Sequence, residues 1–126
     1  MELSEALSRV LHEHELLFGA AIDATGAIIA RAGDPTLLKY TGLVPSLLGP
    51  RGAAKSTFDS LSRVPLPQMF SQSEDFAIVD KPSRNLAILV CGTSDRSAVE
   101  RAVLAEEVGK TIRKVFASVG RAGTRR

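Results

Sequence analysis

The sequence has few of the residues that mark secreted or nucleic-acid-binding proteins. It contains one cysteine in 126 residues, so no internal disulfide can form. It has no tryptophan, five phenylalanines and one tyrosine, and its net charge is only +2. Because a nucleic-acid surface combines a clustered basic face with stacking aromatic side chains, we expect no nucleic-acid partner.

Long hydrophobic runs are also absent. The most apolar stretch, LAILVCG at residues 86–92, is far shorter than the roughly 20 residues of a membrane helix. The first residues, MELSEALSRV, lack the basic start and apolar core of a signal peptide. We therefore expect a cytoplasmic protein without membrane insertion. Cys91 lies inside the apolar stretch, and we expect a buried core residue there rather than a nucleophile.

Length and charge distribution fit one folded domain with a short tail. A chain of 126 residues can bury one core, and 44% hydrophobic with 24% charged residues is typical of globular proteins. Arg121, Arg125 and Arg126 lie in the last six positions, and the remaining thirteen basic and fourteen acidic residues nearly balance. We expect a single domain over residues 1–119 and a basic, disordered tail over residues 120–126.

The first part of the chain has the pattern of a helix followed by a hairpin. Apolar residues recur at helical spacing over residues 3–14, and Ser4 can cap this helix. Two apolar runs, residues 17–22 and 27–32, flank the turn Asp-Ala-Thr-Gly at residues 23–26. The sequence therefore predicts a helix, a strand, a tight turn and a second strand.

A second helix is predicted over about residues 36–61. Asp34 can cap it, and Pro35 suits its first position. Pro45 and the Gly49-Pro50 pair interrupt helical hydrogen bonding, so we expect this helix to be kinked or in two pieces.

The rest of the chain predicts an edge strand, a hairpin and a long helix. VPLPQMFS at residues 64–71 suits an edge strand, and KPSR joins the apolar runs DFAIVD and NLAILVCG. A final helix ending at about residue 118 has one apolar face: Val99, Val103, Val108, Ile112, Val115 and Val119. The element order predicts an α+β sandwich with a central antiparallel sheet of four or five strands.

GPRGAAKST, residues 49–57, partly matches a phosphate-binding loop. Gly49, Lys55 and Ser56 fit the pattern G-x-x-x-x-G-K-[ST], but Ala54 stands where the second glycine belongs. The preceding segment has helical spacing, whereas a phosphate site needs an entering strand. We expect a helix break followed by a new helix start, not a nucleotide site.

The other candidate catalytic groups lack a constellation. His12 and His14 are two residues apart on a helix, so they diverge by about 200° and cannot form a metal pair. Four carboxylates fall at predicted turns or caps: Asp23, Asp34, Asp75 and Asp80. Without a nucleophile, a base and an orienting group in one pattern, we expect no enzyme, no metal and no cofactor.

The hairpin GAAIDATGAIIARAGD, residues 19–34, resembles the opening strands of the roadblock/LC7 family. The resemblance extends over about residues 5–118, and residues 47–92 are similar to the bacterial branch that includes the roadblock partner of the gliding-polarity Ras-like GTPase. It implies a profilin-like α-β-α sandwich with a central antiparallel five-stranded sheet, in the order α-β-β-α-β-β-β-α. Pro45 and Gly49-Pro50 depart from the family's largely continuous second helix.

The resemblance also implies a non-enzymatic homodimer that binds a small Ras-like GTPase. Family members pair their sheets through the third strand, which here contains Leu66, Gln68, Met69 and Phe70. They set their second helices side by side, and bacterial relatives hold the GTPase on that helical face. These relatives accelerate hydrolysis without inserting an arginine, so any activation would come from positioning the GTPase's own residues.

Four residues on the outward side of the predicted second helix, or in its break, are candidate contacts for the GTPase: Lys39, Tyr40, Leu43 and Arg51. An exposed Tyr and Leu among basic residues are typical of the centre of a contact surface. The alternative is that Tyr40 and Leu43 complete the core or the dimer contact.

Three other functions are compatible with parts of the pattern. The first is an adaptor or scaffold dimer in a motility, polarity or signalling complex, with no effect on GTPase activity. The second is a small-molecule sensory module of the profilin, PAS or GAF type, but the interior offers few polar anchors for a ligand. The third is a nucleotide-binding enzyme that uses Lys55 and Ser56.

Overall fold

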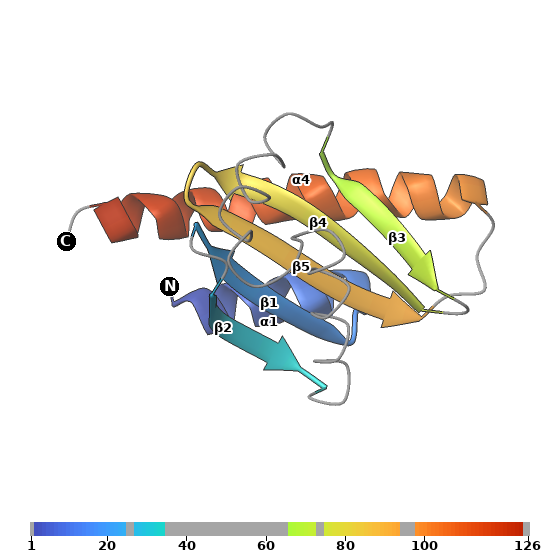
Figure 1. Cartoon of the computed structure of the whole chain (residues 1–126), viewed down its shortest axis with the longest axis horizontal. Helices are drawn as coiled ribbons and strands as arrows, with labels where there is room; N and C mark the ends of the chain where they lie inside the picture. Colours follow the sequence, from blue (N-terminus) through green and yellow to red (C-terminus); the bar gives the residue numbers. More distant parts are fainter. Residues whose placement is uncertain (1, 25–26, 35–65, 73–74, 94–97, 125–126) are drawn as a thin grey trace.

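An antiparallel sheet with two helices on one face organises the part of the chain that the computed structural model describes, residues 2–24, 27–34, 66–72, 75–93 and 98–124 (Figure 1). The elements are α1 (Leu3–His14), β1 (Phe18–Asp23), β2 (Ile28–Gly33), β3 (Gln68–Gln72), β4 (Asp75–Ser83), β5 (Leu86–Thr93) and α4 (Ala98–Thr124). This arrangement confirms the predicted α+β class. The second helix predicted over residues 36–61 lies outside the described residues.

The strands lie in the order β2-β1-β5-β4-β3, and every neighbouring pair is antiparallel. Strand β5 pairs with β1, so the last strand joins the N-terminal hairpin to the β3–β4 hairpin. In this ladder Phe18 faces Cys91. The long-range pairing leaves β2 and β3 at the two edges of the sheet.

Helix α1 forms over the predicted residues 3–14 because its apolar positions recur every three or four residues. Four of its side chains are buried against the sheet: Ala6, Leu7, Val10 and Leu11. Glu2 occupies the N-cap position without a side-chain cap, so the predicted capping role of Ser4 is wrong. The helix ends where Glu15 adopts a left-handed conformation and Leu16 N–H donates to the Leu11 carbonyl at 2.8 Å.

The main core lies between the sheet and the two helices, which are both behind the sheet in Figure 1. Its largest fully buried members on the helices include Leu7, Ile112 and Phe116, and the sheet contributes Ile78 and Ile88. Burial of each such side chain contributes about 1.5–3 kcal/mol before conformational entropy is counted. This packing fixes both helices relative to strands β1, β4 and β5.

The opposite face of the sheet is also apolar and buried. It consists of Phe18, Ala20, Ile22, Ala77, Val79, Ala87, Leu89 and Cys91. Strands covered on both faces read as continuous apolar runs, which explains why β1, β4 and β5 show little alternation of polar and apolar residues. Since α1 and α4 lie on the other face, this is the face on which the sequence resemblance predicts a second helix.

The β1–β2 and β4–β5 hairpins have features that the sequence explains. Asp23 Oδ1 accepts a hydrogen bond from Ala27 N–H at 3.1 Å, so this carboxylate serves the turn as predicted. Strand β4 continues through the predicted KPSR connection as far as Ser83, and the turn lies at residues 84–85. The ladder shifts register between Asp80 and Ser83, and such an irregularity accommodates Pro82, which has no N–H to donate.

Helix α4 differs from its predicted form at both ends. Val108, Ile112 and Val115 are buried, but Val99 and Val103 are 75% and 55% exposed. Val103 precedes Val108 by five residues and is therefore rotated by about 140° from it, so the predicted single apolar face is wrong at this end. The helix also continues to Thr124, through most of the segment for which we expected a disordered tail. Glycine lowers helix stability by only about 1 kcal/mol relative to alanine, so Gly120 and Gly123 need not end the helix.

A candidate interaction edge at strand β3

Strand β3 lies at one edge of the sheet, as predicted, and β4 is its one strand neighbour among the described elements. Gln68, Met69 and Phe70 lie within β3, whereas Leu66 precedes it by two residues. The outer side of an edge strand carries backbone N–H and C=O groups that a further strand can bind. We refer to this side of residues Gln68–Gln72 as the β3 edge; its pairing with a second copy of the chain stays a prediction.

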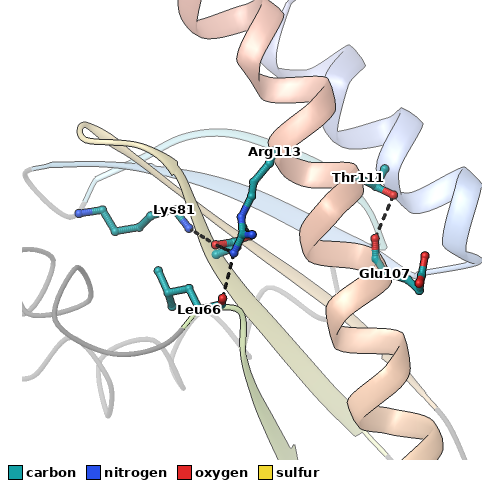
Figure 2. Close-up of polar contacts among 6 residues, drawn as sticks. Leu66, Lys81, Glu107, Thr111 and Arg113 are labelled. Carbon is teal, nitrogen blue, oxygen red and sulfur yellow. Dashed lines mark hydrogen bonds and ion pairs between the residues drawn. The ribbon is translucent and has the colours of Figure 1, made fainter.

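The chain leading into β3 is held by an arginine on helix α4. Arg113 Nη2 donates to the Leu66 carbonyl oxygen at 2.9 Å, as Figure 2 shows. The same guanidinium pairs with Asp80 of β4: Nε lies 3.1 Å from Oδ2, and Nη2 lies 3.4 Å from Oδ1. One side chain therefore connects α4, β4 and the segment that enters β3.

Asp80 is the buried acid of this group, with 1% of its surface exposed. Its Oδ1 accepts a hydrogen bond from Lys81 N–H at 2.8 Å, while Oδ2 is held by the ion pair with Arg113 and by no well-aligned hydrogen bond. The prediction that Asp80 caps a turn is wrong, because β4 continues past it. A buried carboxylate needs a partner of opposite charge, and Arg113 supplies it.

Close approach of α4 to this point depends on Gly109. A Cβ atom at this position would come within 2.9 Å of Pro67 Cγ and 3.2 Å of Asp80 Oδ2. Pro67 is the residue directly before β3, so the helix surface at Gly109 and the side chain of Arg113 contact consecutive residues of the entering segment. No local pattern in the sequence indicates this group, because Arg113 lies 33 residues from Asp80 and 47 residues from Leu66.

A second polar contact joins the two helices. His14 Nε2 lies 2.7 Å from Thr111 Oγ1. Thr111 donates its hydroxyl hydrogen to the Glu107 carbonyl oxygen at 3.1 Å, as Figure 2 shows. The His14 ring and the Thr111 hydroxyl are thus within hydrogen-bonding distance of each other. His14 thus links α1 to α4, while His12 is exposed.

Three findings on the described residues concern metal binding, membrane crossing and cavities. No three His, Cys, Asp or Glu side chains in this part of the chain converge as metal ligands. Neither α1 nor α4, the two described helices, is long and apolar enough to cross a membrane.

An open cavity of about 530 Å³ lies between the end of α1 and the β1–β2 pair, lined by Ser8, Leu11, His12, Glu15, Leu16, Leu17 and Gly33. The residues of the predicted GTPase contact and of the phosphate-loop-like segment lie outside the described residues: Lys39, Tyr40, Leu43, Arg51, Lys55 and Ser56.

Cys91 is buried in β5, as the sequence predicted. Burial, and secondarily the carboxylate of Asp75, raise the pKa of its thiol from the ordinary 9.0 to about 12. Since only the thiolate attacks disulfide reagents, we expect labelling at about pH 8 to be at least about a hundredfold slower in the folded protein than in concentrated urea. Absorbance-monitored labelling measures both rates, and equal rates would contradict the burial of this thiol.

The same thiol gives stability a definite pH dependence. The fold favours the neutral thiol, whereas the unfolded chain ionises above about pH 9. The free energy of unfolding should therefore fall as pH rises from 9.0 towards 12, by up to about 1.4 kcal/mol per pH unit from this group. A Cys91→Ala variant lacks the contribution, so urea unfolding should show a shallower pH slope for it; identical slopes would show that the thiol has the same pKa in both states.

No protein-family model matches the sequence, and no curated protein matches it. Solved structures do match the fold. A roadblock/LC7 domain from Streptomyces avermitilis is 15% identical, with 94% of this chain and 98% of that chain covered and a TM-score of 0.60.

Two proteins from Myxococcus xanthus superpose to a similar extent. MglB is 14% identical, with 91% of this chain and 87% of that chain covered and a TM-score of 0.59. MglC is 10% identical, with 90% and 98% covered and a TM-score of 0.59. At these identities the similarity establishes the fold, and nearly the whole length of each chain takes part. The protein described here therefore has the roadblock/LC7 fold, in the form that MglB also adopts.

Proposed function

We propose that this chain is a non-enzymatic, cytoplasmic homodimer that binds and regulates a small Ras-like GTPase. The observation that carries the proposal is a roadblock/LC7 fold in which β3 is an edge strand among the described elements. The sequence resemblance to the bacterial branch of the family supplies the GTPase as partner, and gliding protein MglB of Thermus thermophilus has the same fold, with a TM-score of 0.57 at 14% identity.

The proposed dimer forms through the β3 edge. Antiparallel pairing of two copies would satisfy the outer backbone groups of β3 and join two five-stranded sheets. Around the edge, Leu66, Gln68, Met69 and Phe70 are the proposed dimer residues. The GTPase would lie on the paired second helices and contact Lys39, Tyr40, Leu43 and Arg51. Regulation would come from positioning the GTPase's own catalytic residues, without an arginine finger from this chain.

The test uses purified components. Light scattering gives the mass of the chain, and the expected value is twice 13.4 kDa. Each small Ras-like GTPase of the source organism is then loaded with GDP or with a non-hydrolysable GTP analogue, and its binding to the dimer is measured by interferometry. We expect one GTPase to bind with a preference for one nucleotide state.

Matched variants locate the surface. Tyr40→Ala and Leu43→Ala should each weaken GTPase binding about tenfold or more without altering the mass of the dimer. Lys114→Ala, at an exposed position on α4, should leave binding unchanged. A dimer that binds no GTPase in either nucleotide state would contradict GTPase regulation and favour the adaptor function.

A further inference from the structure

Arg113 contacts Leu66, a proposed dimer residue two positions before the β3 edge, although Arg113 itself lies on a helix behind the sheet. We propose that Arg113, held by the buried carboxylate of Asp80, is a positioning residue for the β3 edge and sets the affinity of the chain for a second copy of itself. The inference rests on the proposed homodimer and assigns the control of that dimer to residues outside the pairing strand.

Strand β3 pairs with β4 along its whole length. At its C-terminal end it pairs Gln72 with Asp75, the first residue of β4. At its N-terminal end Gln68 pairs with Val79, the residue before Asp80. The hydrogen bond from Arg113 to the Leu66 carbonyl lies just beyond this last pair, so it fixes the end of the strand that the hairpin connection does not hold.

The register of an edge strand decides which side chains face which way. Met69 is half-buried against the core between the sheet and the helices, and a slip of one residue would turn it to the other face. A second copy can pair with β3 only when its outer N–H and C=O groups are held in one arrangement. A strand that is already ordered before association loses less entropy on binding. The hydrogen bond from Arg113 to the Leu66 carbonyl, which we call the anchor, therefore raises dimer affinity.

The chemistry of the anchor requires an arginine. The planar guanidinium reaches a carboxylate through Nε and a carbonyl through Nη2 at the same time. The carboxylate of Asp80 is almost fully buried, whereas the Arg113 side chain is half-exposed. The ion pair with this buried carboxylate therefore restricts where the guanidinium can lie. A lysine would keep the charge near Asp80 but present it as a single point, without the fork that also binds Leu66.

Three variants of the full chain test the proposal. Arg113→Lys keeps the charge and removes the fork; Lys114→Arg is its matched control, an exchange of cations at the next, exposed residue. Gly109→Ala places a methyl group 2.9 Å from Pro67 Cγ, so the segment entering β3 must move away from α4. Alanine favours a helix over glycine, so loss of dimer affinity in this variant cannot result from a weaker α4.

Sedimentation velocity over a range of concentrations measures the dimer dissociation constant, and hydrogen exchange measures the order of β3. We expect Arg113→Lys to raise the dissociation constant about tenfold, the effect of one lost charged hydrogen bond. Gly109→Ala, which displaces the segment entering β3, should raise it by a similar factor. In the monomer, hydrogen exchange at the β3 amides should be faster in these two variants than in the wild type, while exchange at the β5 amides should be unchanged. Lys114→Arg should match the wild type in both measurements.

The outcomes separate the inference from the function on which it rests. A wild-type dimer whose affinity is unchanged by both Arg113→Lys and Gly109→Ala would overturn the positioning role and leave the dimer intact. A wild-type chain that is monomeric at every concentration would overturn the proposed dimer itself. Loss of affinity with unchanged β3 exchange would also overturn the inference, because the anchor would then act by a route other than ordering the strand.

Discussion

Replacing Gly33 with alanine is expected to lower the free energy of unfolding by about 3 kcal/mol or more. Gly33 ends β2 with a φ of +91°, a conformation that L side chains rarely adopt. A Cβ atom here would also overlap the carbonyl oxygen of Leu17 and lie 2.9 Å from Phe18 Cα. Both neighbours are backbone atoms, so no side-chain rotation relieves the overlap, and the β1–β2 pair must separate at this end.

Gly19→Ala on the neighbouring strand is the matched control. Its Cβ would meet the ends of the Leu7 and Leu11 side chains at 3.3 Å, and these flexible groups can move by a few tenths of an ångström. We expect a change of less than about 1 kcal/mol for Gly19→Ala. Urea unfolding of both variants measures the difference. Equal effects at the two glycines would mean that the β2 end of the hairpin tolerates a different backbone path.

The same local rules explain which elements could be predicted. Helix α1 has the predicted bounds, and β1 and β2 each begin and end one residue later than predicted. These elements could be predicted because hydrophobic spacing and the Asp23 turn are short-range signals. Helix α4 was predicted by its buried stripe at Val108 and Ile112. The prediction is wrong at Val99 and Val103 because it places Val103 and Val108 on one apolar face. Residues five positions apart in a helix lie on different sides of it.

Long-range contacts were harder to predict. The prolines before β3 indicated an edge strand, and the strand order agrees, but that order depends on β1 pairing with β5 nearly 70 residues later in the sequence. Asp80 looked like a turn residue because it follows the apolar run FAIV and precedes Lys-Pro. Nothing near it in the sequence identifies Arg113, 33 residues away, as its partner. The anchor of the candidate edge therefore became visible only in three dimensions.

Replacing Arg113 with methionine is expected to destabilise the protein by about 3 kcal/mol. Methionine keeps the aliphatic stem of the side chain and removes the charge that faces Asp80. The carboxylate is 1% exposed, so water cannot replace the lost partner, and an unpaired buried charge is far more costly than the pair. Asp80→Val should have a smaller effect, because the half-exposed guanidinium of Arg113 can be hydrated when its partner is removed.

The double variant Asp80→Val, Arg113→Met should recover most of the stability that Arg113→Met loses, since it leaves no buried charge. Urea unfolding of the wild type, the two single variants and the double variant forms a complete cycle. A double variant as unstable as the sum of the two singles would show that the ion pair contributes no coupling. The double variant also separates the folding role of the pair from its positioning role. It should unfold like the wild type, because a valine–methionine contact restores the core. It should nevertheless dimerise weakly, because neither side chain can donate a hydrogen bond to the Leu66 carbonyl.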